Sequence, residues 1–265
     1  MVAMATVVKF IGKKKLKNAV LITGLPGIGL VGKICVDYLL KQLKAEKIAE
    51  IYSDSFPPSV YTKDSIVELI KDDLFAVTVK GSTVVFLSGP VQPSLDLSGG
   101  FSEEHYEFAE RVVEACHKVG VKRIITLAGI NIGSARMNKA PEVVVAATSK
   151  KVLKEFVVSG GKADTREGLI SGAAGLILGI AKEQGMDGVC LMGETNANLV
   201  YGDHGAAKRV LGLLVHKFGF KVDMSRIEKE SKEIEKAFAE LSKQLEAVQQ
   251  EDVESESNED LTYVR

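Results

Sequence analysis

The sequence has no tryptophan, only three cysteines and almost no net charge in 265 residues. Cys35, Cys116 and Cys190 are far apart and form no Cys-x-x-Cys pair, which argues against a zinc cluster or a disulfide framework. Each stands in an apolar run, so we expect three small buried residues. The formal net charge of −1 gives no electrostatic reason to expect nucleic acid or an anionic membrane as a partner.

Long hydrophobic runs are also missing. None reaches the ~20 residues of a membrane span, and no sustained apolar segment precedes "IGKKKLK" (11–17), as a signal peptide would require. We therefore expect a cytoplasmic protein with no membrane partner. The chain does contain 46% hydrophobic and 26% charged residues, which is typical of a folded protein large enough for one substantial core.

Four short β-branched runs end in or beside glycine and are typical of strands buried on both faces. They lie at 19–24, 83–89, 123–129 and 188–193. Helical patterns separate several of them, over 28–43, 102–119, 169–184 and 203–218. This alternation predicts a three-layer α/β/α fold with a mostly parallel central sheet. Residues 65–87 break the alternation, and their turn at Lys80-Gly81-Ser82 predicts an antiparallel meander added to that sheet.

The chain changes character after a predicted globular domain of residues 1–222. Over 223–248 apolar residues recur mainly at spacings of three and four, an a/d pattern with Ser231 as the polar seam residue. Two interpretations of this amphipathic, coiled-coil-like helix stay open: it lies back on the domain, or it projects and self-associates. Residues 249–265 form a flexible acidic tail, too polar to build a core, with six acids and one arginine.

The stretch "TGLPGIGLVGKIC" (23–35) resembles two phosphate-binding motifs at once. Gly27, Gly29 and Gly32 match G-x-G-x-x-G, while Gly27, Gly32 and Lys33 match most of the P-loop. The P-loop next requires Ser or Thr as a magnesium ligand, and this chain has Ile34 there. The steric interpretation is that the glycines permit a sharp turn after the strand and close packing of the next helix.

A nucleotide or nucleoside site in the glycine loop (24–33) nevertheless stays open as an alternative. A dinucleotide site needs an acid near the end of the second strand, for which Glu50 or Asp54 is available. Glu194 is the one acid near the end of a predicted buried strand, where a P-loop protein holds a metal-binding acid.

Residues suited to catalysis form no recognisable group. Ser88 lies in no G-x-S-x-G elbow, and Asp203, beside His204, is better explained as a helix N-cap than as a base. No His-x-x-His or paired-carboxylate spacing indicates a metal site. We therefore predict no catalytic residue, no cofactor and no metal, and a protein that is not an enzyme.

Four segments in order resemble the archaeal form of the proteasome-assembly chaperone 2 family. They are "GLPGIGLVGK" (24–33), "TLAGI" (126–130), "GAAGLILGIAKEQGMDGVCLMGET" (172–195) and "YGDHGAAKRVLGLLVHKFGFKVD" (201–223). The resemblance implies an α/β/α domain similar to nucleoside-phosphorylase-like folds, with no established catalytic site. It also implies a homo-oligomer that handles proteasome α-subunits or α-rings.

The resemblance further assigns a role to the last five residues. Archaeal family members that bind or activate the proteasome carry a hydrophobic-Tyr-X ending, which inserts between α-subunits so that its carboxylate meets a lysine. Here the five are Leu261, Thr262, Tyr263, Val264 and Arg265, so tyrosine is third from the end rather than second. The extra residue moves the carboxylate by roughly 3.3 Å relative to the tyrosine.

Two hypotheses follow from the sequence. The first is a non-enzymatic, homo-oligomeric chaperone or activator that binds the α-ring of an archaeal-type 20S proteasome through residues 261–265. The second is a nucleotide- or nucleoside-binding α/β protein that uses the glycine loop.

Overall fold

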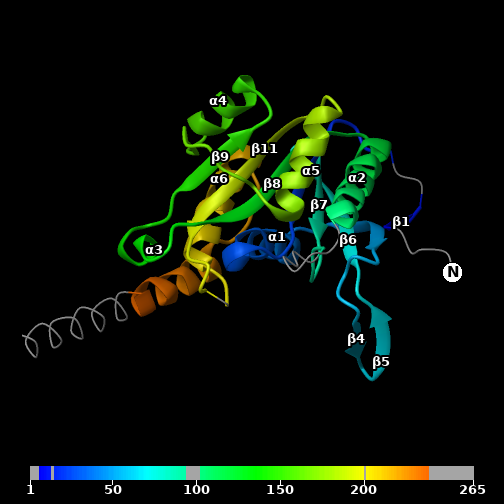
Figure 1. Cartoon of the computed structure of the whole chain (residues 1–265), viewed down its shortest axis with the longest axis horizontal. Coiled ribbons are helices and arrows are strands. Elements are labelled where there is room, and N and C mark those ends of the chain that lie inside the picture. The colour runs from blue at the N-terminus through cyan, green and yellow to red at the C-terminus, as the bar shows by residue number, and fades with distance from the viewer. Residues whose placement is uncertain (1–5, 13–14, 94–101, 200, 239–265) are drawn as a thin grey trace, which may run out of the picture.

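A computed structural model of the chain describes residues 6–12, 15–93, 102–199 and 201–238 (Figure 1). This part of the chain contains a nine-stranded sheet and a two-stranded one. The larger sheet consists of β1 (Val7–Phe10), β2 (Ala19–Gly24), β3 (Glu46–Tyr52), β6 (Asp72–Val79), β7 (Ser82–Ser88), β8 (Val121–Asn131), β9 (Val143–Ala147), β10 (Lys162–Ala163) and β11 (Asp187–Thr195). The smaller sheet pairs β4 (Val60–Lys63) with β5 (Ile66–Leu69).

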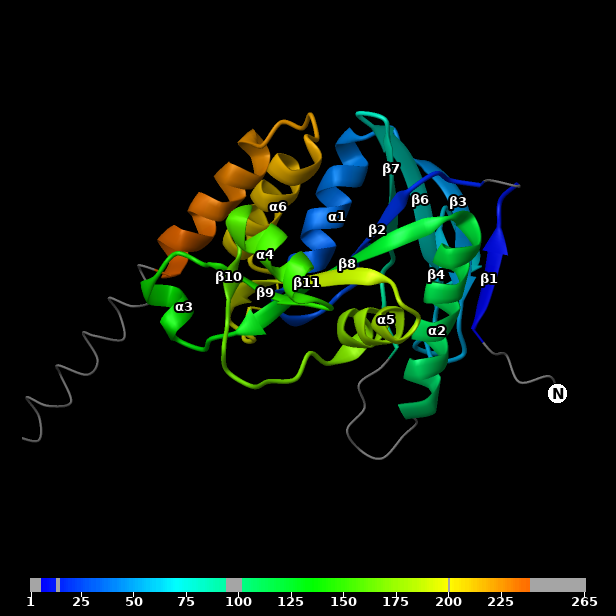
Figure 2. The same cartoon turned by 90° about the horizontal axis from the view of Figure 1, so that it is seen from above.

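Helices cover both faces of the large sheet, so the predicted three-layer α/β/α architecture is confirmed (Figure 2). The labelled helices are η1 (Ile28–Leu30), α1 (Val31–Gln42), α2 (Ser102–Val119), α3 (Ala135–Asn138), α4 (Lys150–Val158), α5 (Gly172–Glu183) and α6 (His204–Phe218). Helices α2 and α5 pack on one face, and α1, α6 and a further helical segment, 225–238, lie on the other. Within the described residues, no helix combines the length and the apolar character needed to cross a bilayer.

The order of strands corrects one part of the prediction. The sheet runs β1-β3-β6-β7-β2-β8-β11-β9-β10, and only its centre, β7-β2-β8-β11, and the edge pair β9-β10 are parallel. The other four pairings are antiparallel, so "mostly parallel" is partly wrong. For three of the four, the reason is local: the short turn at Lys80 and Gly81 sends β7 straight back along β6, and β3 and β1 continue the antiparallel series, while the fourth pairs β9 with β11.

The buried strands and their helices lie where the apolar runs indicate. Strands β2, β7, β8 and β11 correspond to the four predicted runs, and Asp203 caps α6 by accepting a hydrogen bond from the backbone N–H of Ala206 at 2.9 Å. The three cysteines are free and buried, as predicted. Burial raises the pKa of the Cys116 thiol to about 12 and that of Cys190 to about 11, so both stay protonated and unreactive at neutral pH.

The helical segment 225–238 lies back on the domain over its described length. Ile227 is buried in the core formed with α1 and α6, and the hydroxyl of Tyr38 donates to the carbonyl oxygen of Asp223 at 2.6 Å. The predicted seam residue Ser231 and the last described residue, Phe238, are also buried. Residues 239–248 of the predicted helix lie outside the described part.

Candidate functional site

The glycine loop follows β2 and begins α1 with a short 3-10 turn rather than a phosphate cradle. Gly29 has φ +63°, and a methyl group added there would lie 2.4 Å from the hydroxyl oxygen of Thr195. A methyl at Gly32 would lie 2.8 Å from the carbonyl oxygen of Leu127. The close helix-to-sheet packing expected at these two glycines is therefore confirmed. Gly27, with φ −160° and no atom within 4 Å of an added methyl, needs no glycine for its geometry.

Lys33 does not share the surroundings of the glycines. Its ammonium group pairs with the carboxylate of Asp37 one turn along α1, and Ser88 donates to the same carboxylate at 3.0 Å. Both Lys33 and Asp37 line a surface hollow different from the cavity that Gly27 and Gly32 border. Of the four residues in the nucleotide hypothesis, Gly27 and Gly32 therefore border one cavity, whereas Lys33 lines a different hollow.

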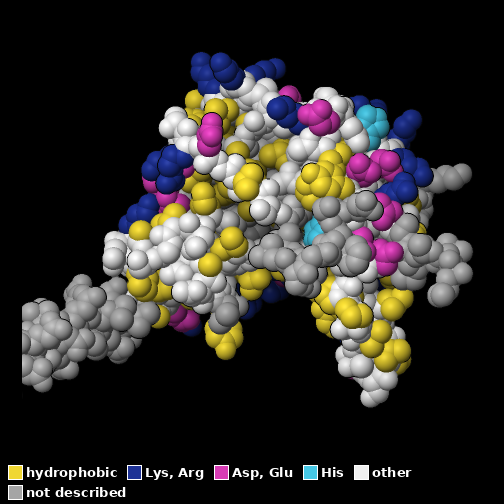
Figure 3. Space-filling view, in the orientation of Figure 1, with side chains coloured by type: hydrophobic (Ala, Val, Ile, Leu, Met, Phe, Trp, Pro, Cys, Tyr) yellow, Lys and Arg dark blue, Asp and Glu magenta, His cyan; other side chains and the backbone are white. Residues whose placement is uncertain are grey.

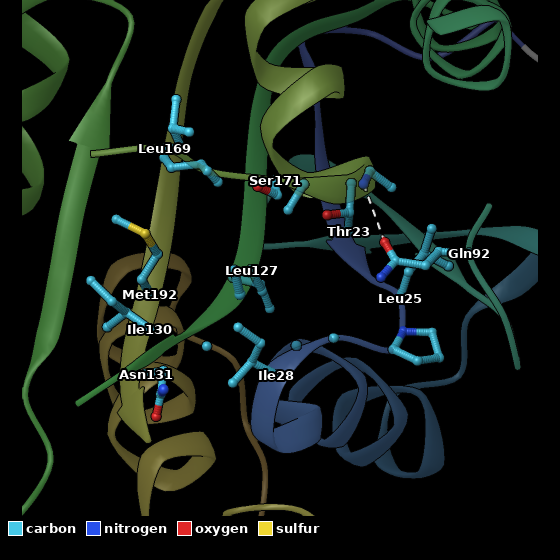
Figure 4. Close-up of a pocket in the computed structure, with 18 residues that line it drawn as sticks. Thr23, Leu25, Ile28, Gln92, Leu127, Ile130, Asn131, Leu169, Ser171 and Met192 are labelled. Carbon is cyan, nitrogen blue, oxygen red and sulfur yellow. Dashed lines mark hydrogen bonds between the residues drawn. The ribbon is translucent and has the colours of Figure 1, made fainter. Parts of the chain in front are cut away.

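That cavity, of about 270 Å³, lies at the carboxyl ends of β2, β8 and β11, where ligands bind in many parallel sheets (Figure 4). Its walls are mainly apolar, with Leu127, Ile130 and Met192 among them. Four neutral polar residues also contribute to the lining: Thr23, Gln92, Asn131 and Ser171. Its described lining includes no charged side chain and no histidine, so the cavity suits a neutral group better than a phosphate.

Glu194, the acid at the end of β11, is also directed away from this cavity. It accepts hydrogen bonds from the ammonium of Lys139 at 3.0 Å and from the backbone N–H of Glu142 at 3.1 Å. It therefore fixes the loop between α3 and β9. Among the described residues no cluster of side chains is arranged to hold a metal ion.

A buried ion pair lies beside the glycine loop. Arg136, from α3, and Asp203, before α6, have fully buried side chains and share two hydrogen bonds, of 2.8 and 3.0 Å. The hydroxyl of Thr195 donates to the same carboxylate at 3.0 Å, and the backbone N–H of Asp203 donates to the carbonyl of Gly29 at 2.8 Å. Asp203 thus joins α3, the end of β11 and the glycine loop.

Arg136 also holds the end of the described chain. Its Nη2 lies 2.7 Å from Oε1 of Glu235, and the guanidinium stands 5.1 Å from the centre of the Phe238 ring. We call Arg136, Asp203 and Glu235 the clasp. Since Glu235 belongs to the segment 225–238, the clasp fixes the position from which the chain continues toward residues 239–265.

The clasp had no signal in the sequence. Arg136 and Glu235 are 99 residues apart, and each looks like an ordinary surface charge in its own segment. Only Asp203 was singled out, as a cap. The five residues 261–265, predicted to contact a partner, lie outside the described residues.

Comparisons with known proteins cover almost the whole chain. The model of the PAC2 family matches residues 21–242. An uncharacterised protein of Methanocaldococcus jannaschii is 32% identical over 268 residues, spanning 98% of this chain and all of that one.

Solved structures show the same relationship. Pyrococcus furiosus PbaB, described as an archaeal proteasome activator, is 30% identical over 90% of this chain and 99% of its own, with a TM-score of 0.80. PbaA of the same organism, described as an archaeal homologue of proteasome-assembly chaperone, is 24% identical and covers 98% of this chain and all of its own, with a TM-score of 0.69. The family resemblance expected from the four segments is therefore confirmed.

Proposed function

Because the chain belongs to the PAC2 family, we propose that it is a non-enzymatic protein that binds the α-ring of an archaeal-type 20S proteasome, as an assembly chaperone or an activator. The observation that carries the proposal is the similarity along nearly the full chain to PbaB, a proteasome activator. The buried, fully paired state of Asp203 agrees with a structural rather than a catalytic role for this acid, and the neighbouring His204 lies 3.4 Å from Glu230 instead.

Residues 261–265 are the proposed contact with the α-ring. In this division residues 1–222 form the body, 223–248 a helix and 249–265 the tail. The clasp holds Phe238 against the body; with 239–248 as helix at ~1.5 Å per residue and 249–261 extended at ~3.3 Å, Leu261 can reach ~58 Å from Phe238. The acids of residues 249–260 would steer the tail toward basic surfaces between α-subunits.

Self-association would strengthen a weak peptide contact. A homo-oligomer presents several tails to one ring, and tethering raises the effective concentration of each remaining tail after the first has bound. Overall affinity can then exceed that of one tail by ~10²–10⁴.

The test is capture of purified α-rings by the full chain and by a chain that lacks Leu261–Arg265. We expect the deletion to abolish capture and any stimulation of peptide hydrolysis. A control that removes Ser255–Asn258 keeps five of the six tail acids and residues 261–265, and it should retain both. Equal capture by both deletion variants would rule out residues 261–265 as the contact.

A second candidate function is binding of a neutral small molecule, such as a nucleoside, in the strand-edge cavity. Four uncharged polar residues and the glycine loop favour it. Calorimetric titration with ATP, NAD and nucleosides tests it. Ala174→Leu, which fills the cavity from α5, should abolish binding. Gly29→Val is less informative because its side chain would strike Thr195. Micromolar binding that Ala174→Leu does not affect would place the ligand elsewhere.

A further inference from the structure

The hairpin of residues 60–69, which we call the arm, stands away from the body of the molecule (Figure 1). Its strands β4 and β5 hydrogen-bond to each other and to no strand of the large sheet. It carries five of the thirteen exposed large apolar side chains of the described residues. The space-filling view shows hydrophobic side chains gathered on the arm (Figure 3). They are Val60, Tyr61, Ile66, Val67 and Leu69, and each is at least half exposed.

The arm lacks the features that make a hairpin stable by itself. Two strands without a core beneath them are marginal in water, and exposed strand edges invite pairing with another chain. The two turn residues, Asp64 and Ser65, have φ of +51° and +64°, a left-handed geometry that usually takes Asn-Gly. A gathering of exposed apolar side chains of this kind marks an interaction surface.

One face of the arm continues onto the body. Val60 pairs with Leu69 and Thr62 with Val67, so these four side chains lie on one face. Val60 and Leu69 also line a groove of about 460 Å³ at the base of the arm, together with Phe56, Pro57, Pro58 and Ile70. Arm and groove therefore form one largely apolar surface over residues 52–70.

Charge and size point to a second copy of the same chain as the occupant. The charged residues of the arm are Lys63, Asp64 and Glu68, which sum to −1, so two arms repel each other little and neither attracts a polyanion. Sixteen of residues 52–70 are at least partly exposed, a little below the ~20–30 residues that a standard interface takes from each partner. An apolar projection and an apolar groove on one chain can satisfy each other reciprocally across a two-fold axis.

We propose that the arm is a self-association element: across a two-fold axis, the face of one arm that carries Val60, Val67 and Leu69 packs on the same face and groove of a second copy. This inference rests on the homo-oligomer of the proposed function and names the surface that forms it. Packing of these faces would cover Val60, Val67 and Leu69 of both chains and would support two hairpins that are marginal alone.

The test compares Val67→Glu with Val158→Glu in the full chain by sedimentation over a range of concentrations. Val67 is on the arm, and Val158, 81% exposed at the end of α4, is the matched control for an added charge. We expect Val67→Glu to weaken self-association at least tenfold and Val158→Glu to leave it unchanged. Equal association of both variants and the unsubstituted chain would overturn the proposal.

A second variant guards against misfolding of the first. It removes residues 60–69 and joins Ser59 to Ile70 through Asn-Gly, which the pairing of Val60 with Leu69 allows without moving the body. Circular dichroism should show an unchanged fold, and the variant should be a monomer. A folded variant that still associates like the full chain would overturn the role of the arm.

The same experiments separate this inference from the proposed function. If the unsubstituted chain is a monomer and still captures α-rings, the arm proposal is wrong and the proposed α-ring binding stands. If Val67→Glu keeps the oligomer and loses capture of α-rings, the arm faces the ring rather than a second copy, and the proposal is wrong. If deletion of residues 261–265 abolishes capture of α-rings but leaves the oligomer unchanged, the arm proposal stands.

Discussion

The clasp and the arm differ in which of their side chains are exposed to water. At the clasp, two charged side chains are fully buried, yet each is satisfied by the other and by neighbouring groups. At the arm, five large apolar side chains are exposed, and the arm adjoins a groove at its base rather than a core. The body around the clasp therefore completes itself within one chain, whereas the arm has the composition of a surface that a partner completes.

The largest effect we expect comes from breaking the clasp. Asp203→Ala leaves the guanidinium of Arg136 buried without its main partner and removes the cap of α6, so unfolding in urea should show a loss of about 3–5 kcal/mol. Glu235→Gln changes a partner that is 39% exposed and keeps one of the two oxygens that accept from Arg136, so it should cost much less. Equal losses for the two variants would mean that the buried pair does not dominate.

Helix-to-sheet packing at the glycine loop should give the next largest effect. Gly32→Ala places a methyl 2.8 Å from the carbonyl oxygen of Leu127, so either α1 or β8 must shift, at about 1–3 kcal/mol of unfolding free energy. Gly27→Ala is the matched control, since an added methyl there meets nothing within 4 Å and should change stability by under ~0.5 kcal/mol. A costly Gly27→Ala with a harmless Gly32→Ala would contradict the steric account of this loop.

The buried end of β6 gives a pH-dependent prediction. Burial, with the nearby charge of Asp73, raises the pKa of Asp72 well above its ordinary value of 3.8, despite the opposing charge of Lys33. A raised folded pKa means that the stabilising contribution is complete below pH 3.8 and is lost as pH rises through the folded value. Asp72→Asn should therefore reduce the fall in stability above pH 4 and be more stable than the unsubstituted chain at pH 8, by roughly 1–3 kcal/mol.

Thermal unfolding from pH 4 to pH 8 measures this difference. A constant gap between Asp72→Asn and the unsubstituted chain over that range would show that the carboxyl of Asp72 does not titrate differently in the folded state.

The smallest effect is expected on the arm itself. Ile66→Ser removes a side chain that is 68% exposed, so the unfolding free energy of the monomer should change by less than ~0.5 kcal/mol. Chemical denaturation at a concentration where sedimentation finds a monomer measures it. A loss of unfolding free energy as large as that of Gly32→Ala would mean that the arm is part of the core of the body, which would contradict the contrast with the clasp.

Local sequence patterns were sufficient to predict the centre of the fold. Uninterrupted β-branched runs placed β2, β7, β8 and β11, because strands buried on both faces carry apolar residues at every position. The same reasoning predicted parallel pairing for too much of the sheet. The strands beyond β7 are antiparallel because short connections join them, which the composition of the strands does not reveal. The meander predicted over residues 65–87 is correct for β6 and β7, but β5 belongs to the separate arm.

The candidate site was harder to predict because its contacts are long-range. The glycines near residue 29 were visible, and so was the capping role of Asp203. Their connection to Arg136 and Glu235 exists only in the folded chain, since no short-range spacing relates these residues. The cavity likewise combines residues from β2, β8, α5 and β11, and its lack of charge could not be inferred from the loop alone.

The central claim, that the chain binds a proteasome α-ring through residues 261–265, is tested most directly by the dissociation constant of the full chain for purified α-rings. We predict that Tyr263→Ala raises this constant at least tenfold, while Thr262→Ala, the neighbouring control, changes it less than threefold. An unchanged constant for Tyr263→Ala, or no binding of the unsubstituted chain, would contradict the account.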